Sequence, residues 1–288
     1  MHDNHGSSTT SLECPICDSV SVRLCYSVNQ YKIYLCKECR GAFASPRPED
    51  HEVSDIYDEE YLKVYKQSPS HGNEYSDWRF AGLSNLIDKT VGFDAVQKTR
   101  SVLDIGCGTG YFLSRFAQNG WDAHGMEVLP QSAKYARNEF GLDVTVGDFI
   151  AVDIAPDSYD LVTMIHVIEH FIDPNRVMKK SREILKPGGL FFLETPNWDG
   201  IGSTIQKEKW SHLIPPEHLN YFGPSSIRVL AERNGFQILS LMTATPPYLE
   251  SIRGYPKPIQ IMMRLIYEAS SLLQRGPTLQ VLLTRESN

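Results

Sequence analysis

The stretch from Ser101 to Phe116, SVLDIGCGTGYFLSRF, places three glycines between a short apolar run and a helical pattern. The apolar run predicts a buried strand that ends at Ile105, and the following residues predict a helix that starts near Tyr111. Glycine adopts backbone angles that other residues avoid, and its missing side chain lets a ligand come close to the chain. The stretch therefore predicts a strand, a tight turn and a helix, with the turn against a bound group. The glycines of the turn are Gly106, Gly108 and Gly110.

Short apolar runs and helical stretches alternate from residue 99 to residue 288, which is typical of a parallel sheet with helices on both faces. We expect strands over residues 102–105, 122–126, 143–146, 159–165 and 189–194. Further along the chain, we expect a helix over 225–233, a strand over 236–243, a helix over 259–273 and a strand over 279–283. The predicted fold class is therefore α/β and Rossmann-like, with ligands at the carboxyl ends of the strands.

The last predicted helix carries an apolar stripe, because its apolar residues are spaced three and four apart and share one side of the helix. We expect this stripe to pack on the sheet, and a dimer contact or a lipid-like acceptor are the alternatives. The stripe consists of Met262, Leu265, Ile266, Ala269 and Leu273.

Four cysteines near the start of the chain form two CxxC pairs separated by 18 residues. This spacing favours a structural zinc site over a redox-active or disulfide pair, because two tight turns can aim four thiolates at one tetrahedral ion. Between the pairs, two β-rich runs joined by Asn29 and Gln30 predict a hairpin. We expect a zinc ribbon over residues 1–48, with a flexible N-terminus, that holds about one zinc ion per chain, whereas Cys25 serves packing. The predicted ligands are Cys14, Cys17, Cys36 and Cys39.

The chain carries a formal net charge of −7, so it offers no broad basic face to a nucleic acid. Its first residues are polar, and no apolar run reaches the ~18 residues that a membrane span needs. We therefore expect a cytoplasmic protein without a membrane partner, in which thiols stay reduced. The sequence leaves both monomer and dimer open.

A linker rich in acidic residues, proline and tyrosine follows the ribbon over residues 49–98. Tyr57, Tyr61 and Tyr65 recur at four-residue spacing, which predicts one face of a helix. Packing against the next domain is favoured over a lid on an active site, because aromatic stripes usually belong to a core.

Two carboxylates close neighbouring predicted strands. Glu127 ends the strand after the glycine-rich turn, where it can accept two hydrogen bonds from a ribose diol, as in dinucleotide sites. Asp148 follows the next strand, where it can accept a hydrogen bond from an adenine amino group. A nicotinamide oxidoreductase would normally show GxGxxG, and Gly110 falls one position too early for that pattern. The carboxylates therefore predict a nucleotide-containing cofactor.

Five segments sharpen this prediction: VLDIGCGTG, HGMEV, VGDF, YDLVTMIHVIEHF and LKPGGLFFLETPN. Over residues 100–196 the chain resembles the class I S-adenosylmethionine-dependent methyltransferases. The resemblance implies a seven-stranded sheet within residues 99–288 and a pocket for S-adenosylmethionine. The residues implied to line this pocket are Asp104, Gly106, Gly108, Gly110, Glu127 and Asp148, with Ile165 and His166 against the methionine part.

The wider layout, from CRGAFASPRP through the core to PPEHLNYF, is similar to a bacterial group of zinc-ribbon methyltransferases. Members of that group often act in saccharide or secondary-metabolite pathways. The chain departs from the group at Arg40, where a glycine often follows the cysteine directly.

Histidines and one glutamate are the candidates for acid–base chemistry, because imidazole titrates near neutral pH. His218, in PPEHLNYF, is the preferred general base because its loop follows the fifth strand and can cover the pocket. His170 is the second candidate. Glu169 and His170 can instead orient the helix that Asp173 and Pro174 open, or hold a metal ion.

The predicted reaction is methylation of a small molecule, at a hydroxyl or carbon of a sugar or natural-product intermediate. The alternative is an RNA or protein methyltransferase that holds its substrate with the ribbon, and the acidic net charge argues against RNA. A non-catalytic module that works through the ribbon stays open. Trp198 and Trp210, in the insertion before PPEHLNYF, are expected to serve packing rather than line an acceptor pocket.

Overall fold

The computed structural model describes residues 12–48, 73–91, 100–247 and 254–285. Its centre is a seven-stranded sheet of order β10-β11-β8-β7-β4-β5-β6. The strands β4 to β8 are parallel where they pair, and β11 runs antiparallel to both of its neighbours. The bounds are β4 (Ser101–Ile105), β5 (Asp122–Glu127), β6 (Asp143–Val146), β7 (Tyr159–Ile165), β8 (Leu185–Pro196), β10 (Phe236–Ala244) and β11 (Thr278–Arg285). The predicted Rossmann-like sheet is therefore confirmed.

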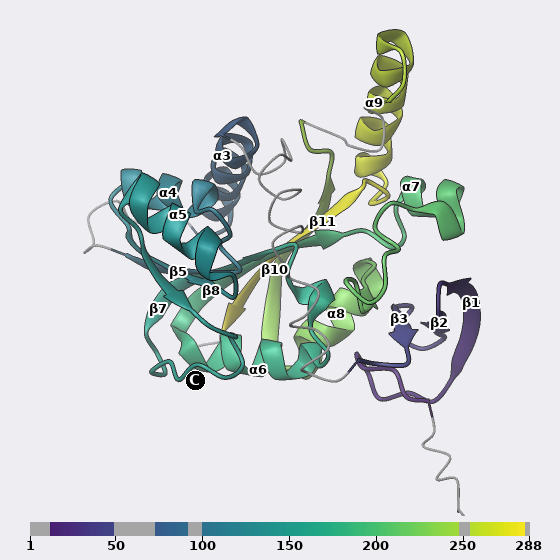
Figure 1. The fold of residues 1–288 in the computed structure, drawn as a ribbon, viewed down its shortest axis with the longest axis horizontal. Helices are drawn as coiled ribbons and strands as arrows, with labels where there is room; N and C mark the ends of the chain where they lie inside the picture. Colours follow the sequence, from purple (N-terminus) through teal and green to yellow (C-terminus); the bar gives the residue numbers. More distant parts are fainter. Residues whose placement is uncertain (1–11, 49–72, 92–99, 248–253, 286–288) are drawn as a thin grey trace, which may run out of the picture.

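Helices cover both faces of this sheet (Figure 1). One face carries α3 (Asn73–Thr90), α4 (Tyr111–Gln118) and α5 (Pro130–Phe140), and the other carries α6 (Pro174–Ile184) and α8 (Pro224–Arg233). Each layer has its own apolar core: Leu83 and Phe116 belong to the first, and Val177 and Leu230 to the second. Because helices bury both faces of the sheet, its strands are nearly continuous apolar runs in the sequence.

The predicted start of α6 is confirmed by its capping. The Asp173 carboxylate accepts hydrogen bonds from the backbone N–H groups of Asn175, at 2.9 Å, and Arg176, at 3.1 Å. Pro174 occupies the first turn, where its missing N–H costs nothing. The strand predicted over residues 189–194 is longer than expected, because Leu185 already pairs with Tyr159.

The cysteine-rich segment forms a second sheet of order β1-β2-β3-β9. The hairpin of β1 (Val22–Val28) and β2 (Tyr31–Cys36) turns at the two residues expected, and β3 (Ala42–Ser45) follows it. The fourth strand, β9 (Asn220–Tyr221), comes from the PPEHLNYF segment. This sheet therefore crosses the boundary at residue 48 that the sequence predicts.

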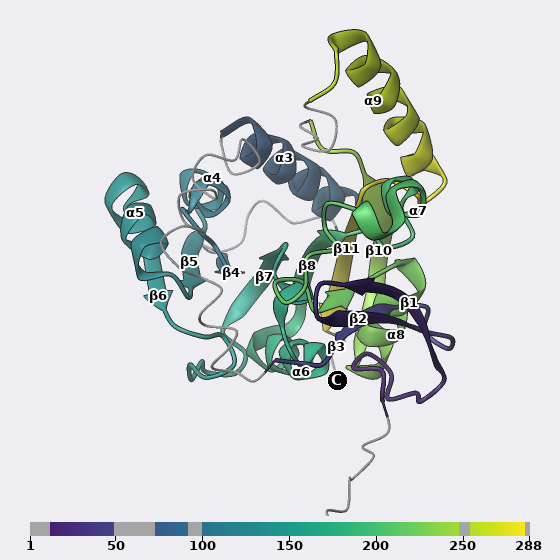
Figure 2. The same cartoon turned by 45° about the vertical axis from the view of Figure 1, so that its right-hand side comes forward.

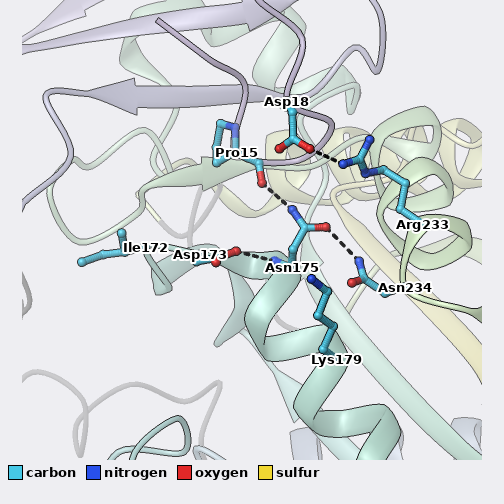
Figure 3. Close-up of a pocket in the computed structure, with 8 residues that line it drawn as sticks. All are labelled: Pro15, Asp18, Ile172, Asp173, Asn175, Lys179, Arg233 and Asn234. Carbon is cyan, nitrogen blue, oxygen red and sulfur yellow. Dashed lines mark hydrogen bonds and ion pairs between the residues drawn. The ribbon is translucent and has the colours of Figure 1, made fainter. Parts of the chain in front are cut away.

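The ribbon is also bound to α6 and α8 through polar contacts around a hollow of about 330 Å³ (Figure 3). The Pro15 carbonyl accepts a hydrogen bond from Asn175, at 2.7 Å, and Asn234 donates to the same asparagine, at 2.9 Å. Asp18 forms an ion pair with Arg233. None of the site residues predicted from the sequence lines this hollow, so we interpret it as part of the ribbon contact.

Gly41 lets the ribbon approach α8 closely. A Cβ atom at this position would lie 2.5 Å from Cδ1 of Ile16 and 2.8 Å from Cβ of Ser226. Cys14, Cys36 and Cys39 share one buried cluster with the α8 side of the sheet. The ribbon is therefore packed into the molecule rather than tethered to it.

The two tryptophans serve packing, as expected. Trp198 lies between Tyr26 of β1, at a ring distance of 6.1 Å, and Tyr221 of β9, at 5.5 Å. Trp210 is 7% exposed and belongs to the cluster that joins the ribbon to the rest of the chain. Cys25 packs against the same cluster.

The helix α9 (Lys257–Leu272) stands apart from the body of the molecule (Figure 2). Its buried residues are Tyr267 and Ser270, whereas Leu265 is 61% exposed and Leu273, just beyond its end, is 76% exposed. The prediction that the apolar stripe packs on the sheet is wrong, because the side of the helix with Tyr267 and Ser270 faces the molecule and the stripe is exposed. No helix among the described residues is long and apolar enough to cross a membrane.

The stripe of Tyr57, Tyr61 and Tyr65 lies outside the described residues. Within the predicted linker, the described helix α3 packs on α4, with the rings of Phe80 and Phe116 in edge contact at 5.0 Å.

Candidate active site and zinc centre

The glycine-rich turn lies at the carboxyl end of β4, and its glycines have positive φ angles. A Cβ atom on Gly106, with φ of 71°, would lie 2.5 Å from the Val167 side chain. A Cβ atom on Gly110, with φ of 82°, would lie 2.7 Å from Ala136 of α5. Both glycines are therefore required by the backbone angle and by packing. Gly106 also allows the turn to contact Val167, the residue that follows His166.

Glu127 ends β5 beside this turn and is 6% exposed. One carboxylate oxygen accepts a hydrogen bond from the Gly108 N–H, at 2.8 Å, and the other accepts from the Leu129 N–H, at 2.9 Å. Burial raises its pKa, and these backbone donors oppose that rise. The two bonds fix the carboxylate at the strand end and leave further lone pairs for a diol.

Asp104 lies beneath the turn and is 3% exposed. Burial raises the pKa of its carboxyl to about 7, although the Thr163 hydroxyl donates a hydrogen bond to it, at 2.6 Å. The third predicted carboxylate, Asp148, is exposed after β6 and accepts a hydrogen bond from the Ile150 N–H, at 2.9 Å. The donor-side carboxylates therefore occupy the ends of three adjacent strands.

His166 follows β7 directly, after Ile165, and has a φ of 52°, in the left-handed region. This turn of the backbone places its ring between two buried carboxylates: Nδ1 lies 3.4 Å from Glu169, and Nε2 lies 3.3 Å from Glu194. Burial alone would lower the pKa of His166, but the two glutamates raise it to about 9. The ring is therefore an imidazolium at neutral pH.

Glu194 extends this chain of charges to α3. Its carboxylate accepts hydrogen bonds from Arg79, at 2.8 Å, and from Gln280 of β11, at 2.8 Å. Burial would raise the pKa of Glu194, but Arg79 and His166 lower it to about 2. Two cations and two anions thus alternate in a buried row, which compensates the cost of desolvating each of them.

Glu169 closes this row next to the other predicted histidines. Its Oε2 accepts a hydrogen bond from Thr195, at 3.0 Å, whereas its buried Oε1 is held only by the ion pair with His166, at 3.4 Å from Nδ1. Burial would raise its pKa, but the ion pair with His166 and the nearby His170 lower it to about 2. A buried, ionised oxygen whose one partner lies at this distance can still accept a hydrogen bond from a substrate hydroxyl.

His170 and His218 meet edge to face, with ring centroids 4.8 Å apart. His170 places Nδ1 at 2.7 Å from the Glu217 carbonyl and Nε2 at 3.2 Å from the His166 carbonyl. Both of its nitrogens therefore face backbone acceptors. Of the two rings, His218 is better placed to accept a proton.

His218 is 6% exposed, and its Nδ1 donates a hydrogen bond to the His212 carbonyl, at 2.8 Å. That bond places the hydrogen on Nδ1 and leaves the lone pair on Nε2. Burial lowers the pKa of His218 well below its ordinary value, and the nearby His170 lowers it further. The ring is neutral and can act as a hydrogen-bond acceptor toward a substrate.

The structure brings the predicted catalytic residues together. Ligand atoms of Glu169, His170 and His218 lie within 4.8 Å of one another, close enough for one metal ion. The sequence prediction missed Arg79, Glu194 and His212. The last of these stacks on His218, with ring centroids 5.9 Å apart, and burial together with His166 lowers its pKa to about 4.

The four ribbon cysteines fit a tetrahedral zinc site. Sγ of Cys14 lies 3.6 Å from Sγ of Cys39, and Sγ of Cys17 lies 3.5 Å from Sγ of Cys36. A zinc–sulfur distance of about 2.3 Å places tetrahedral ligands roughly 3.8 Å apart. All four ligand atoms lie within 4.8 Å of one another. The donor set and its geometry therefore match a structural zinc ion.

Arg40 adopts a backbone conformation that favours glycine, the residue that the resemblance to zinc-ribbon methyltransferases leads us to expect after the last cysteine. Its φ is 68°, in the left-handed region that glycine adopts without cost. The position follows the last cysteine of the ribbon, so the backbone turn is retained with a less favourable residue.

A family model described as a methyltransferase domain matches residues 75–241, which is more than half of the chain. A ubiquinone biosynthesis O-methyltransferase from Bordetella avium is 36% identical over 150 residues, which cover 48% of this chain and 62% of that protein. The protein of the same name from Pseudomonas savastanoi pv. phaseolicola is 34% identical, with 56% and 73% covered. The chain thus spans less than two thirds of the Bordetella protein's length.

Solved structures agree on the fold. An S-adenosylmethionine-dependent methyltransferase from Archaeoglobus fulgidus matches with a TM-score of 0.53 at 20% identity, over 79% of this chain and all of that one. One from Mesorhizobium loti matches with a TM-score of 0.52 at 18% identity, over 73% and 98%. At these identities the likeness shows the fold alone.

Proposed function

The chain belongs to the family defined by this methyltransferase domain, and on that premise we propose that it transfers a methyl group from S-adenosylmethionine to a hydroxyl of a small molecule. The observation that carries the proposal is the contact between the glycine-rich turn, which would hold the donor, and the turn that carries His166, which would hold the acceptor. Gly106 of the donor turn packs against Val167, which lies between His166 and Ile168 of the histidine-bearing turn. A donor and an acceptor held on these two turns would be neighbours.

The residues on the donor side fit S-adenosylmethionine. Glu127, held by two backbone donors, would bind the ribose diol, and the exposed Asp148 would bind the adenine amino group. When bound, S-adenosylmethionine supplies an electrophilic methyl group on a sulfonium sulfur. Alignment of an acceptor with such a group lowers the barrier by several kcal/mol, on the order of 7–11 in favourable intramolecular models.

The residues on the acceptor side fit a hydroxyl. Oε1 of Glu169, which is ion-paired with His166, would accept its hydrogen bond through a remaining lone pair, and Nε2 of His218 would receive its proton. A positioned base of this kind typically contributes ~10²–10⁴ in rate. The ion-paired His166 would hold the geometry of Glu169 without taking part in the transfer.

The relatives support this acceptor class, because both are named O-methyltransferases. A hydroxyl is therefore favoured over the carbon acceptor that the sequence left open. We extend the proposal to a sugar or natural-product intermediate on the basis of the zinc-ribbon layout. The acidic net charge continues to disfavour RNA.

Zinc belongs to the proposal as a structural ion, held by the four ribbon cysteines. A closed site with four thiolate ligands leaves no position for a substrate, so the ion would stabilise the fold rather than take part in the reaction.

Isothermal titration of the purified protein with S-adenosylmethionine, its demethylated product and NAD tests the proposal. We expect the first two to bind and NAD not to bind. Glu127→Ala should weaken binding of both by tenfold or more, whereas the matched Glu139→Ala on the exposed side of α5 should not. Binding of NAD alone would refute the proposal.

A further inference from the structure

The ribbon is joined to the two turns that carry the catalytic candidates. The Ala44 N–H of β3 donates a hydrogen bond to the Leu219 carbonyl, at 3.0 Å, and the Leu219 N–H donates to the Glu169 carbonyl, at 2.8 Å. Leu219 directly follows His218 in the chain. Backbone hydrogen bonds of one residue, Leu219, thus connect a ribbon strand to both turns.

Arg47, just beyond β3, adds a second connection. One terminal nitrogen of its guanidinium donates to the Leu219 carbonyl, at 2.8 Å, and to the Asn220 side chain, at 3.1 Å. The other donates to the Phe171 carbonyl, at 3.2 Å, and to the Ile172 carbonyl. The two nitrogens therefore bind different turns, one that follows His170 and one that follows His218.

Asn220 reinforces this arrangement, because its side-chain N–H also donates to the Phe171 carbonyl, at 2.7 Å. A planar guanidinium presents its donors at fixed angles, so it sets the separation of two groups of acceptors. A lysine ammonium is a single point on a flexible stem and would satisfy one turn at a time.

We propose that Arg47 is a positioning residue, through which the ribbon sets the distance between the turn of Glu169 and His170 and the turn of His218. The ribbon then holds the acceptor-binding machinery in place instead of gripping a macromolecule. The assignment rests on the proposed methyl transfer for its catalytic consequence, whereas the positioning itself concerns only this chain.

Hydrogen–deuterium exchange on the full chain tests the positioning. In Arg47→Ala we expect exchange at least tenfold faster in peptides over residues 168–172 and 214–222. Peptides over residues 104–110 should keep their protection. The matched control is Arg23→Ala, which removes an exposed arginine of the ribbon and should change neither region. Unchanged exchange of both turns in Arg47→Ala would overturn the proposal.

Kinetics separate positioning from a merely structural role. With dihydroxybenzoate as the probe acceptor, we expect Arg47→Ala to lower kcat at least tenfold while KM for S-adenosylmethionine stays within twofold. Arg47→Lys should restore part of kcat. An unchanged kcat in a chain whose turns exchange faster would also overturn the proposal. If the wild-type protein does not methylate this probe, the exchange result alone decides the role of Arg47.

Discussion

At the scale of single residues, the site depends on a histidine in an unusual backbone conformation. His166 adopts a left-handed φ of 52° at the end of β7, and this places its ring between Glu169 and Glu194. A non-glycine residue in this region costs free energy, which the two ion pairs offset. The unusual φ of His166 is therefore a feature of the site rather than an irregularity of the strand.

The pKa of His166 predicts a pH dependence of stability. Because its folded-state pKa, about 9, lies above the ordinary value of 6.5, its stabilising contribution is complete below pH 6.5 and is lost as pH rises through 9. The free energy of unfolding should therefore fall less steeply over this range in His166→Gln than in the wild type. Urea titrations at several pH values measure the difference, and parallel curves would contradict the assignment.

The tautomer of His218 predicts the effect of its replacement. His218→Asn keeps a donor near the His212 carbonyl but removes the lone pair of Nε2. We expect turnover to fall at least tenfold, with affinity for S-adenosylmethionine unchanged, because a positioned base contributes ~10²–10⁴ in rate. Steady-state kinetics with dihydroxybenzoate and titration with the cofactor check this. Unaltered turnover would remove His218 from the mechanism.

The sequence identified those site residues that lie next to a recognisable pattern. Glu127 could be found because it closes a strand, and the same rule applied to the segment FFLETP would have found Glu194. Arg79 has no such signal, since it lies on a helix without a motif and reaches the site only through tertiary packing. The position of the His212 ring likewise depends on the conformation of a loop, which residue spacing does not determine.

At the scale of elements, the presence and order of the strands and helices followed from periodicity and turn residues, whereas β8 begins earlier than predicted. Each predicted strand of the core exists, and α6 begins at the capping residue expected. The sharing of β9 with the ribbon sheet could not be predicted, because two residues in extended conformation leave no pattern. The stripe on α9 was assigned to the core because periodicity shows which residues share a face but not what covers that face.

The ribbon predicts a dependence on zinc. Purified protein should contain about one zinc ion per chain. Cys36→Ser should lose this ion and expose β3 and β9 to exchange, since metal binding contributes folding free energy to a small segment. Metal analysis and hydrogen–deuterium exchange measure both effects. Cys25→Ser, outside the cluster, is the control, and full zinc content in Cys36→Ser would contradict the site.

At the scale of the whole molecule, stability is distributed unevenly between the sheet and the projecting helix. Leu193 of β8 is fully buried, whereas Leu272 of α9 is 87% exposed. We expect Leu193→Ala to lower the free energy of unfolding by about 2–5 kcal/mol. The same change at Leu272 should alter it by less than about 0.5 kcal/mol. Denaturant unfolding compares the two, and an equal cost at both positions would show that α9 is covered in solution.

The whole molecule combines the proposed donor site, the proposed acceptor-side cluster and a ribbon that we propose holds this cluster in place. The combination predicts an enzyme whose substrate is small, because the ribbon is packed against the core and its strand β3 is paired with β9. An RNA substrate would need a basic surface that the chain's net charge of −7 does not supply.

The most direct test is transfer of a labelled methyl group. The purified protein would be incubated with methyl-labelled S-adenosylmethionine and a cell extract, and small molecules, RNA and protein would then be separated. Label in the small-molecule fraction, incorporated at least tenfold more slowly with His218→Asn, is the result expected. Label confined to RNA or protein would contradict the proposed acceptor class, and a protein that neither binds the donor nor transfers its label would contradict the proposed activity.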